Sequence, residues 1–62
     1  MYFVKETRIS KGLSQEKLAK IAGVSRATIA CLETNNNART STGTLIKIAT
    51  ALECKVSDIF VA

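Results

Sequence analysis

The chain has 62 residues, a length that fits one small domain and leaves no space for a second. Hydrophobic residues make up 47% of it, which is too apolar for a disordered tail, and the net charge is +4. With no His and two Cys, the sequence lacks the common zinc motifs and the residue sets of most acid–base enzymes. We therefore expect one globular domain over residues 1–62, not an enzyme, with no metal or cofactor.

Neither a membrane span nor a secretory signal is visible in the sequence. No uncharged apolar run approaches the ~18 residues of a membrane span, so we expect no membrane contact. Cys31 and Cys54 could form a disulfide, but a single bridge in a domain without a signal-peptide pattern is a poor interpretation. We expect free thiols and a cytoplasmic location.

Basic side chains are concentrated in the first two-thirds of the chain. Residues 1–39 carry seven basic and three acidic side chains, whereas residues 40–62 carry two of each. This distribution is typical of a protein with one face toward a polyanion, although an ordinary basic surface would give the same totals.

Short helices separated by turn residues are predicted along the chain. The first runs from about Phe3 to Lys11 and stops at Gly12, a residue suited to the left-handed conformation that ends helices. Ser14 can cap a second helix, Gln15–Ala22, which Gly23 ends. The residues that recur at helical spacing within it are Leu18, Ile21 and Ala22.

The third helix and a polar loop follow directly. Ser25 can cap a helix over Arg26–Glu33, whose inward residues would be Ile29 and Leu32. The stretch Thr34–Ser41 is polar and rich in Asn, so it predicts an exposed loop.

Two further helices complete an all-α fold. Ser41 or Thr42 can cap the fourth, and a short fifth helix at Val56–Phe60 would cover the remaining core. No strand pattern of useful length is present. The apolar stripe of the fourth helix falls at i, i+3, i+4 and i+7: Leu45, Ile48, Ala49 and Leu52.

The second and third helices are joined by a three-residue turn that contains Gly. Two short helices joined in this way form a helix-turn-helix, whose second helix lies in the major groove of DNA. Ala19 is small where the helices would cross, and Gly23 permits the tight turn. The shared apolar seam would comprise Leu18, Ala22, Val24, Ile29 and Leu32.

The chain resembles the Cro/phage-repressor (XRE-type) helix-turn-helix family through the stretch GLSQEKLAKIAGVSRATI followed by Leu32-Glu33. The likeness resumes at residues 45–49 and 58–60 and so spans nearly the whole chain. It implies a compact, five-helix, lambda-repressor-like DNA-binding domain of a prokaryotic or phage regulator. Such proteins usually bind a palindromic double-stranded DNA operator as a homodimer.

Three residues depart from the family pattern. Thr7 and Thr42 stand where a larger aliphatic residue is usual, which should thin the core locally. Glu53 stands where Gly commonly ends the fourth helix. Either that turn avoids the left-handed conformation or Glu53 accepts strain of about 1 kcal/mol.

The resemblance places base-reading residues at the start and on the outer face of the third helix. Arg26 could bond both O6 and N7 of guanine through its planar fork, or instead contact phosphate or solvent. Ala27 and Ala30 could pack on thymine methyl groups, or they could only favour the helix. Cys31 lies one turn beyond Ala27 and could reach a base or remain an inert, partly buried thiol.

Phosphate contacts are expected around this helix. Gln15 begins the second helix, where its amide and free backbone N–H groups could meet a phosphate, as the Gln of the family does, or face solvent. Ser25 could both cap a helix and touch phosphate, and Thr28 would lie toward the DNA backbone. The loop candidates, which could also be solvated, are Thr34, Asn37, Arg39 and Thr40. In the family fold Arg8 and Glu33 would form an ion pair that positions the recognition helix.

The leading hypothesis is a sequence-specific DNA-binding transcriptional regulator, a repressor by analogy, that inserts Arg26–Glu33 into the major groove as a dimer. No small-molecule ligand is indicated. The alternative is a protein-interaction or antitoxin-like module with the same fold, because a fold does not determine function. Binding to DNA that weakens steeply with salt would separate the two.

Overall fold

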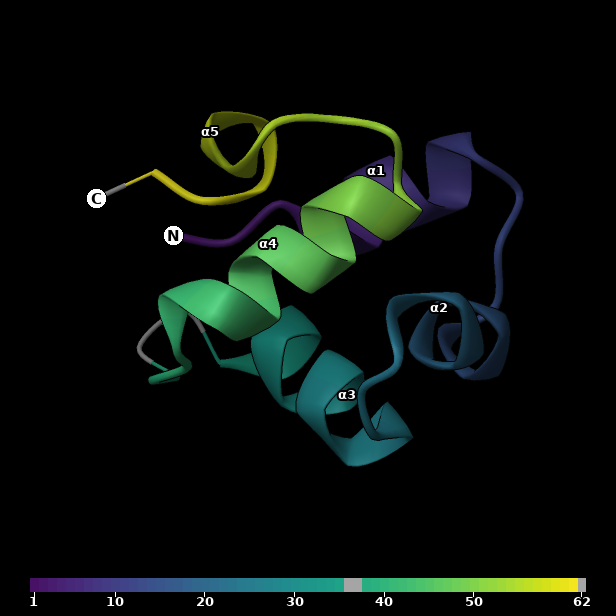
Figure 1. Ribbon diagram of the computed structural model, residues 1–62, viewed down its shortest axis with the longest axis horizontal. Coiled ribbons are helices and arrows are strands. Elements are labelled where there is room, and N and C mark those ends of the chain that lie inside the picture. Colours follow the sequence, from purple (N-terminus) through teal and green to yellow (C-terminus); the bar gives the residue numbers. More distant parts are fainter. Residues whose placement is uncertain (36–37, 62) are drawn as a thin grey trace.

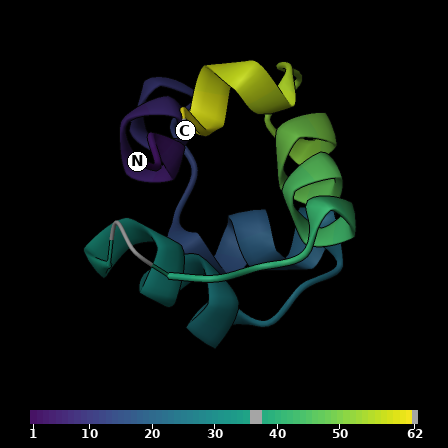
Figure 2. The same cartoon turned by 90° about the vertical axis from the view of Figure 1, so that its left-hand side faces the viewer.

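The computed structural model describes residues 1–35 and 38–61. Helix α2 packs against both α3 and α4, while α1 packs against α3 and α5 against α4 (Figure 1). The two chain ends lie close together beside α5 (Figure 2). The predicted all-α, five-helix fold is confirmed, and in the described residues its helices are α1 (Val4–Ser10), α2 (Gln15–Ala22), α3 (Arg26–Thr34), α4 (Thr42–Ala51) and α5 (Val56–Ile59).

Serine side chains determine where three of these helices begin. The Oγ atoms of Ser14, Ser25 and Ser41 each accept a hydrogen bond from the backbone N–H three residues further on, at 3.0, 3.1 and 3.1 Å. Each cap satisfies an N–H group that has no partner inside its helix and contributes about 1 kcal/mol. The cap of α4 is therefore Ser41 and not Thr42.

Helix boundaries differ from the predicted ones by one residue at several ends. Helix α1 is Val4–Ser10 rather than Phe3–Lys11, and α3 continues to Thr34. Helix α5 ends before Phe60, because Phe60 is extended and forms an antiparallel bridge with Tyr2. This pairing of the chain ends has no counterpart in the sequence pattern.

Every helix contributes to a single apolar core. Burying one side chain of Leu or Ile size contributes about 1.5 to 3 kcal/mol, so the inner faces of the helices are firmly held. The inward residues predicted for α3 and α4 are all buried. The core comprises Val4, Leu18, Ala19, Ala22, Ile29, Leu32, Leu45, Ile48, Ala49, Leu52 and Ile59.

Ile21 recurs at helical spacing with Leu18 and Ala22 in the sequence, but it does not join them in the core: its side chain is 54% exposed. Helix α2 presents Leu18, Ala19 and Ala22 to the core. An α-helix has about 3.6 residues per turn, so Ile21, three residues after Leu18, falls just short of one full turn. Its side chain therefore lies on the side of Leu18 opposite to Ala19, at the edge of the buried face. In a short helix, spacing alone does not tell which flank is covered.

The two threonines that depart from the family pattern lie in different settings. Thr42 is exposed, so its position does not belong to the core. Thr7 is half-buried, and its hydroxyl donates to the Phe3 carbonyl at 2.9 Å.

None of the described helices is long and apolar enough to cross a membrane.

Helix α4 ends in a Schellman motif whose left-handed residue is Glu53. The N–H of Cys54 donates to the Ala49 carbonyl at 2.9 Å, and the N–H of Glu53 donates to Thr50 at 3.1 Å. The φ angle of Glu53 is 56°, so the residue adopts the left-handed conformation that favours glycine. Of the two sequence-based alternatives, the strained one is realised.

Glu53→Gly is therefore expected to raise the free energy of unfolding by about 1 kcal/mol, because glycine adopts this φ without a steric penalty. Chemical denaturation would measure the change. Glu53→Gln is the matched control, since it removes the charge and keeps the side chain. Equal stability of the Gly and Gln variants would contradict the assignment of strain.

Candidate nucleic-acid interface

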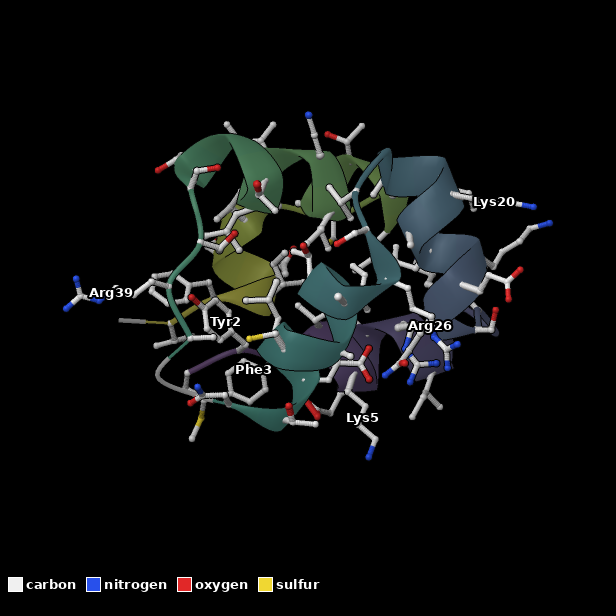
Figure 3. The ribbon with its side chains drawn as sticks, turned by 90° about the horizontal axis from the view of Figure 1, so that it is seen from below. Tyr2, Phe3, Lys5, Lys20, Arg26 and Arg39 are labelled. Carbon is white, nitrogen blue, oxygen red and sulfur yellow. The ribbon has the colours of Figure 1, made fainter. Side chains whose placement is uncertain are left out.

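Helix α3 has one buried face and one open face. Ile29 is fully buried and Leu32 is 2% exposed on the inner face. On the outer face Arg26, Ala27 and Cys31 are exposed. Figure 3 views the molecule from below, with α3 toward the reader, Arg39 at the left margin and Arg26 right of centre. The fourth predicted base contact, Ala30, is half-buried.

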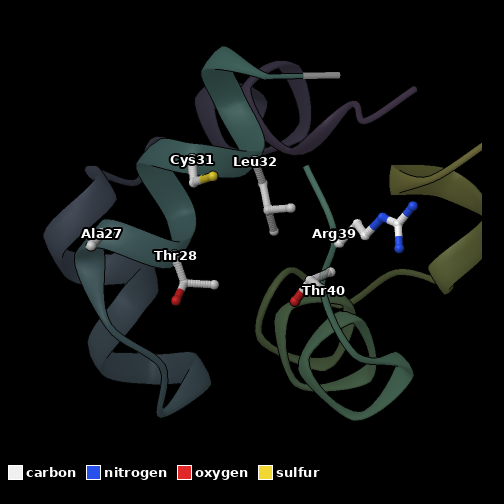
Figure 4. Close-up of a pocket in the computed structure, with 6 residues that line it drawn as sticks. All are labelled: Ala27, Thr28, Cys31, Leu32, Arg39 and Thr40. Atoms are coloured by element: carbon white, nitrogen blue, oxygen red, sulfur yellow. The ribbon is translucent and has the colours of Figure 1, made fainter. Parts of the chain in front are cut away.

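A shallow hollow of about 270 Å³ lies between α3 and residues 39–40 (Figure 4). It brings predicted base contacts of α3 together with predicted phosphate contacts of the loop. Its lining residues are Ala27, Thr28, Cys31, Leu32, Arg39 and Thr40. Arg39 is exposed, whereas Leu32 is buried.

The sequence did not predict the hollow or that Leu32 lines it, because both depend on the path of the loop in space. No local pattern encodes that path. Among the loop candidates, Thr40 is half-buried and Thr34 is exposed at the end of α3. Asn37 lies outside the described residues.

Hydroxyl groups at the ends of α3 are engaged locally. The Oγ of Ser25, besides capping the helix, shares a hydrogen bond of 2.8 Å with Oγ1 of Thr28. The hydroxyl of Thr34 donates to the Ala30 carbonyl at 2.9 Å. Ser25 and Thr34 are exposed, and Thr28 is half-buried. Phosphate contacts by these three residues stay predictions.

Gln15 lies at the start of α2 and is half-buried. Its Nε2 atom donates to Oε1 of Glu33 at 3.1 Å, so the amide is directed toward the end of α3. A phosphate at this helix start would meet the remaining amide hydrogen and the free backbone N–H groups. The phosphate contact of Gln15 stays a prediction, and the contact with Glu33 is an additional role.

Arg8 of α1 and Glu33 of α3 form the ion pair that the family resemblance implies. Nε of Arg8 lies 2.7 Å from Oε2 of Glu33, and Nη2 lies 3.1 Å from Oε1. Nη1 of Arg8 also donates to the Leu13 carbonyl at 2.7 Å. The side chains of Arg8 and Glu33 are 13% and 2% exposed. The bidentate pair thus ties α3 to α1 and to the segment before α2.

The pKa of Glu33 reflects two opposing influences. Burial acts to raise the pKa of its carboxyl group. The hydrogen bonds from Arg8 and Gln15, together with the positive charges of Arg8 and Lys5, outweigh burial and hold the pKa below its ordinary value. Glu33 is therefore ionised at neutral pH, as the ion pair requires.

The two cysteines are free thiols. Cys31 is exposed on α3, and Cys54 is half-buried after α4. Burial raises the pKa of Cys54, and the nearby charge of Asp58 raises it further against the opposing charge of Lys11. Within the described residues, no three His, Cys, Asp or Glu side chains gather as a metal site would need.

Comparisons with known proteins agree with this geometry. A family model described as helix-turn-helix matches residues 4–59. The restriction-modification controller protein C.AhdI from Aeromonas hydrophila is similar in structure, with a TM-score of 0.82 and 35% identity over 92% of this chain and 85% of that one. SinR, the master regulator for biofilm formation solved in complex with DNA, gives a TM-score of 0.81 and 31% identity over 87% of this chain and 86% of its own. A search of curated proteins finds no match.

The chain therefore belongs to the XRE-type helix-turn-helix family of DNA-binding transcriptional regulators. The helix-turn-helix consists of α2 and α3. The matched proteins are regulators.

Proposed function

We propose that this protein is a sequence-specific transcriptional regulator that inserts α3 into the major groove of a palindromic operator as a homodimer. It acts in the cytoplasm and is not an enzyme. The observation that carries the proposal is the open face of α3, where Arg26, Ala27 and Cys31 are exposed on a helix whose opposite face is buried. A helix held in this way can enter a groove without unfolding.

Two further features support the proposal. The hollow beside α3 places Arg39 next to the recognition surface, where a guanidinium can reach a phosphate oxygen. The Arg8–Glu33 pair fixes the orientation of α3 relative to α1. Among the matched proteins, SinR is solved in complex with DNA.

The small size of the recognition surface supports the proposal of a homodimer. One helix reads only a few base pairs, and a twofold repeat of the site is the simplest way to reach specific affinity. Two half-sites about one helical turn of DNA apart would then lie on one face of the duplex.

The proposal is tested by titrating the wild-type protein with double-stranded DNA at several salt concentrations. The logarithm of the affinity should fall linearly with the logarithm of the salt concentration, because each neutralised phosphate contributes about −0.9 to the slope. Binding that is absent in dilute buffer, or is indifferent to salt, would overturn the proposal.

One observation favours the alternative of a protein-interaction module. A groove of about 540 Å³ lies between α2 and α4 and is bordered by Ile21 and Ile46, which are 54% and 51% exposed. Exposed apolar side chains around a groove are typical of protein contacts. If this surface carries the function, Ile46→Asp should abolish capture of a partner protein, capture should be insensitive to salt, and Arg26→Ala should have no effect.

A further inference from the structure

The hydroxyl of Tyr2 joins two segments that are far apart in the sequence. It donates to the backbone carbonyl of Ala38 at 2.6 Å, although the two residues are 36 positions apart. The ring of Tyr2 is half-buried and packs on Phe60, with ring centroids 5.0 Å apart and an interplanar angle of 37°. A phenol held on one side by an aromatic ring has little freedom to leave its acceptor.

The backbone around Tyr2 is also held in place. The N–H of Phe3 donates to the Ile59 carbonyl at 2.7 Å, and the N–H of Val61 donates to the Met1 carbonyl at 2.9 Å. These bonds flank the bridge between Tyr2 and Phe60 on both sides. Tyr2 is therefore anchored to the domain independently of its contact with Ala38.

Ala38 immediately precedes the two loop residues that form one wall of the hollow beside α3, Arg39 and Thr40. In Figure 3 the ring of Tyr2 lies on the side of α3 toward Arg39. The N–H of Ala38 also donates to the Asn35 carbonyl at 3.0 Å, a contact within the same connection. The hydrogen bond from Tyr2, in contrast, ties Ala38 to a distant part of the fold.

We propose that Tyr2 is a positioning residue for the DNA interface: its hydroxyl fixes the Ala38 carbonyl and thereby holds Arg39 and Thr40 beside α3. This inference rests on the proposed function. A loop that is already ordered in the free protein loses little conformational entropy when DNA binds. The smaller entropy loss appears as higher affinity. Tyr2 itself need not touch DNA.

The first test uses the free protein and does not depend on DNA. Tyr2→Phe removes the hydroxyl and keeps the ring on Phe60. Backbone ¹⁵N relaxation should show the order parameters of Arg39 and Thr40 falling from about 0.85, the value of rigid backbone, toward about 0.6. Thr7→Val is the matched control, because it also deletes a hydroxyl that donates to a backbone carbonyl, here that of Phe3 at the start of α1. Unchanged order parameters in Tyr2→Phe would overturn the proposal.

The second test measures coupling to Arg39 in DNA binding. Tyr2→Phe should weaken binding about threefold to tenfold, the equivalent of one hydrogen bond. Arg39→Ala should lose less affinity in the Tyr2→Phe background than in the wild type, and Tyr2→Phe should flatten the salt dependence as Arg39→Ala does. A purely structural role would lower stability without this coupling, so additive effects would overturn the proposal. If the wild type binds no DNA, the proposed function fails, whereas the relaxation data still decide whether Tyr2 orders the loop.

Discussion

Glu33→Gln is expected to lower the free energy of unfolding by about 3 kcal/mol. Removing one member of a buried ion pair leaves the other uncompensated and costs about 3 to 5 kcal/mol. The lower end applies here, because Arg8 is 13% exposed and keeps its bond to the Leu13 carbonyl. Chemical denaturation at neutral pH would measure the loss. Glu16→Gln is the matched control, since Glu16 is exposed on α2.

The loss of stability caused by Glu33→Gln should depend on pH. The pKa of Glu33 is lower in the folded than in the unfolded protein, so the unfolded state binds more protons as the pH falls. The stability that the carboxylate contributes is fully present above its unfolded pKa and is lost as the pH falls through its folded pKa. The difference between wild type and Glu33→Gln should therefore shrink in acid. A difference that is constant down to acidic pH would show that Glu33 stabilises the fold by something other than its charge.

Arg26→Ala is expected to relax discrimination at one base position of each half-site by about 1 to 3 kcal/mol. Arg26 is exposed at the first turn of α3, where its guanidinium can bond two atoms of a guanine edge. The measurement is a set of titrations against an operator in which each base pair is replaced in turn. Unaltered base preferences in the variant would assign Arg26 to phosphate or solvent.

Gln15→Ala provides the comparison for this experiment. A phosphate contact carries no sequence information, so its loss should weaken all operators similarly. Because Gln15 also donates to Glu33, the stability of the variant must be measured alongside. A loss confined to particular sequences would indicate that Gln15 acts through the placement of α3.

The helix-turn-helix itself could be predicted because its signals are local. Ser14 and Ser25 lie directly before their helices, and Gly23 supplies the left-handed turn between α2 and α3. The Arg8–Glu33 pair followed from the family resemblance and not from spacing. For Glu53 the sequence posed two alternatives, and only the structure shows which is realised.

What could not be predicted depends on contacts between distant parts of the chain. The exposure of Ile21 is determined by where α3 and α4 cover α2, which periodicity in an eight-residue helix does not specify. The bond from Tyr2 to Ala38 joins a residue before the first helix to a loop. The hollow beside α3 exists because that loop returns toward the helix, and neither segment alone encodes it.

The role of α3 as a recognition helix is tested most directly by letting the wild-type protein select bound duplexes from a pool of random double-stranded DNA. We expect enrichment of a short motif repeated with twofold symmetry, with half-sites about one turn of DNA apart. Recovery of random sequence, or of no DNA at all in dilute buffer, would contradict the assignment of α3 as a recognition helix.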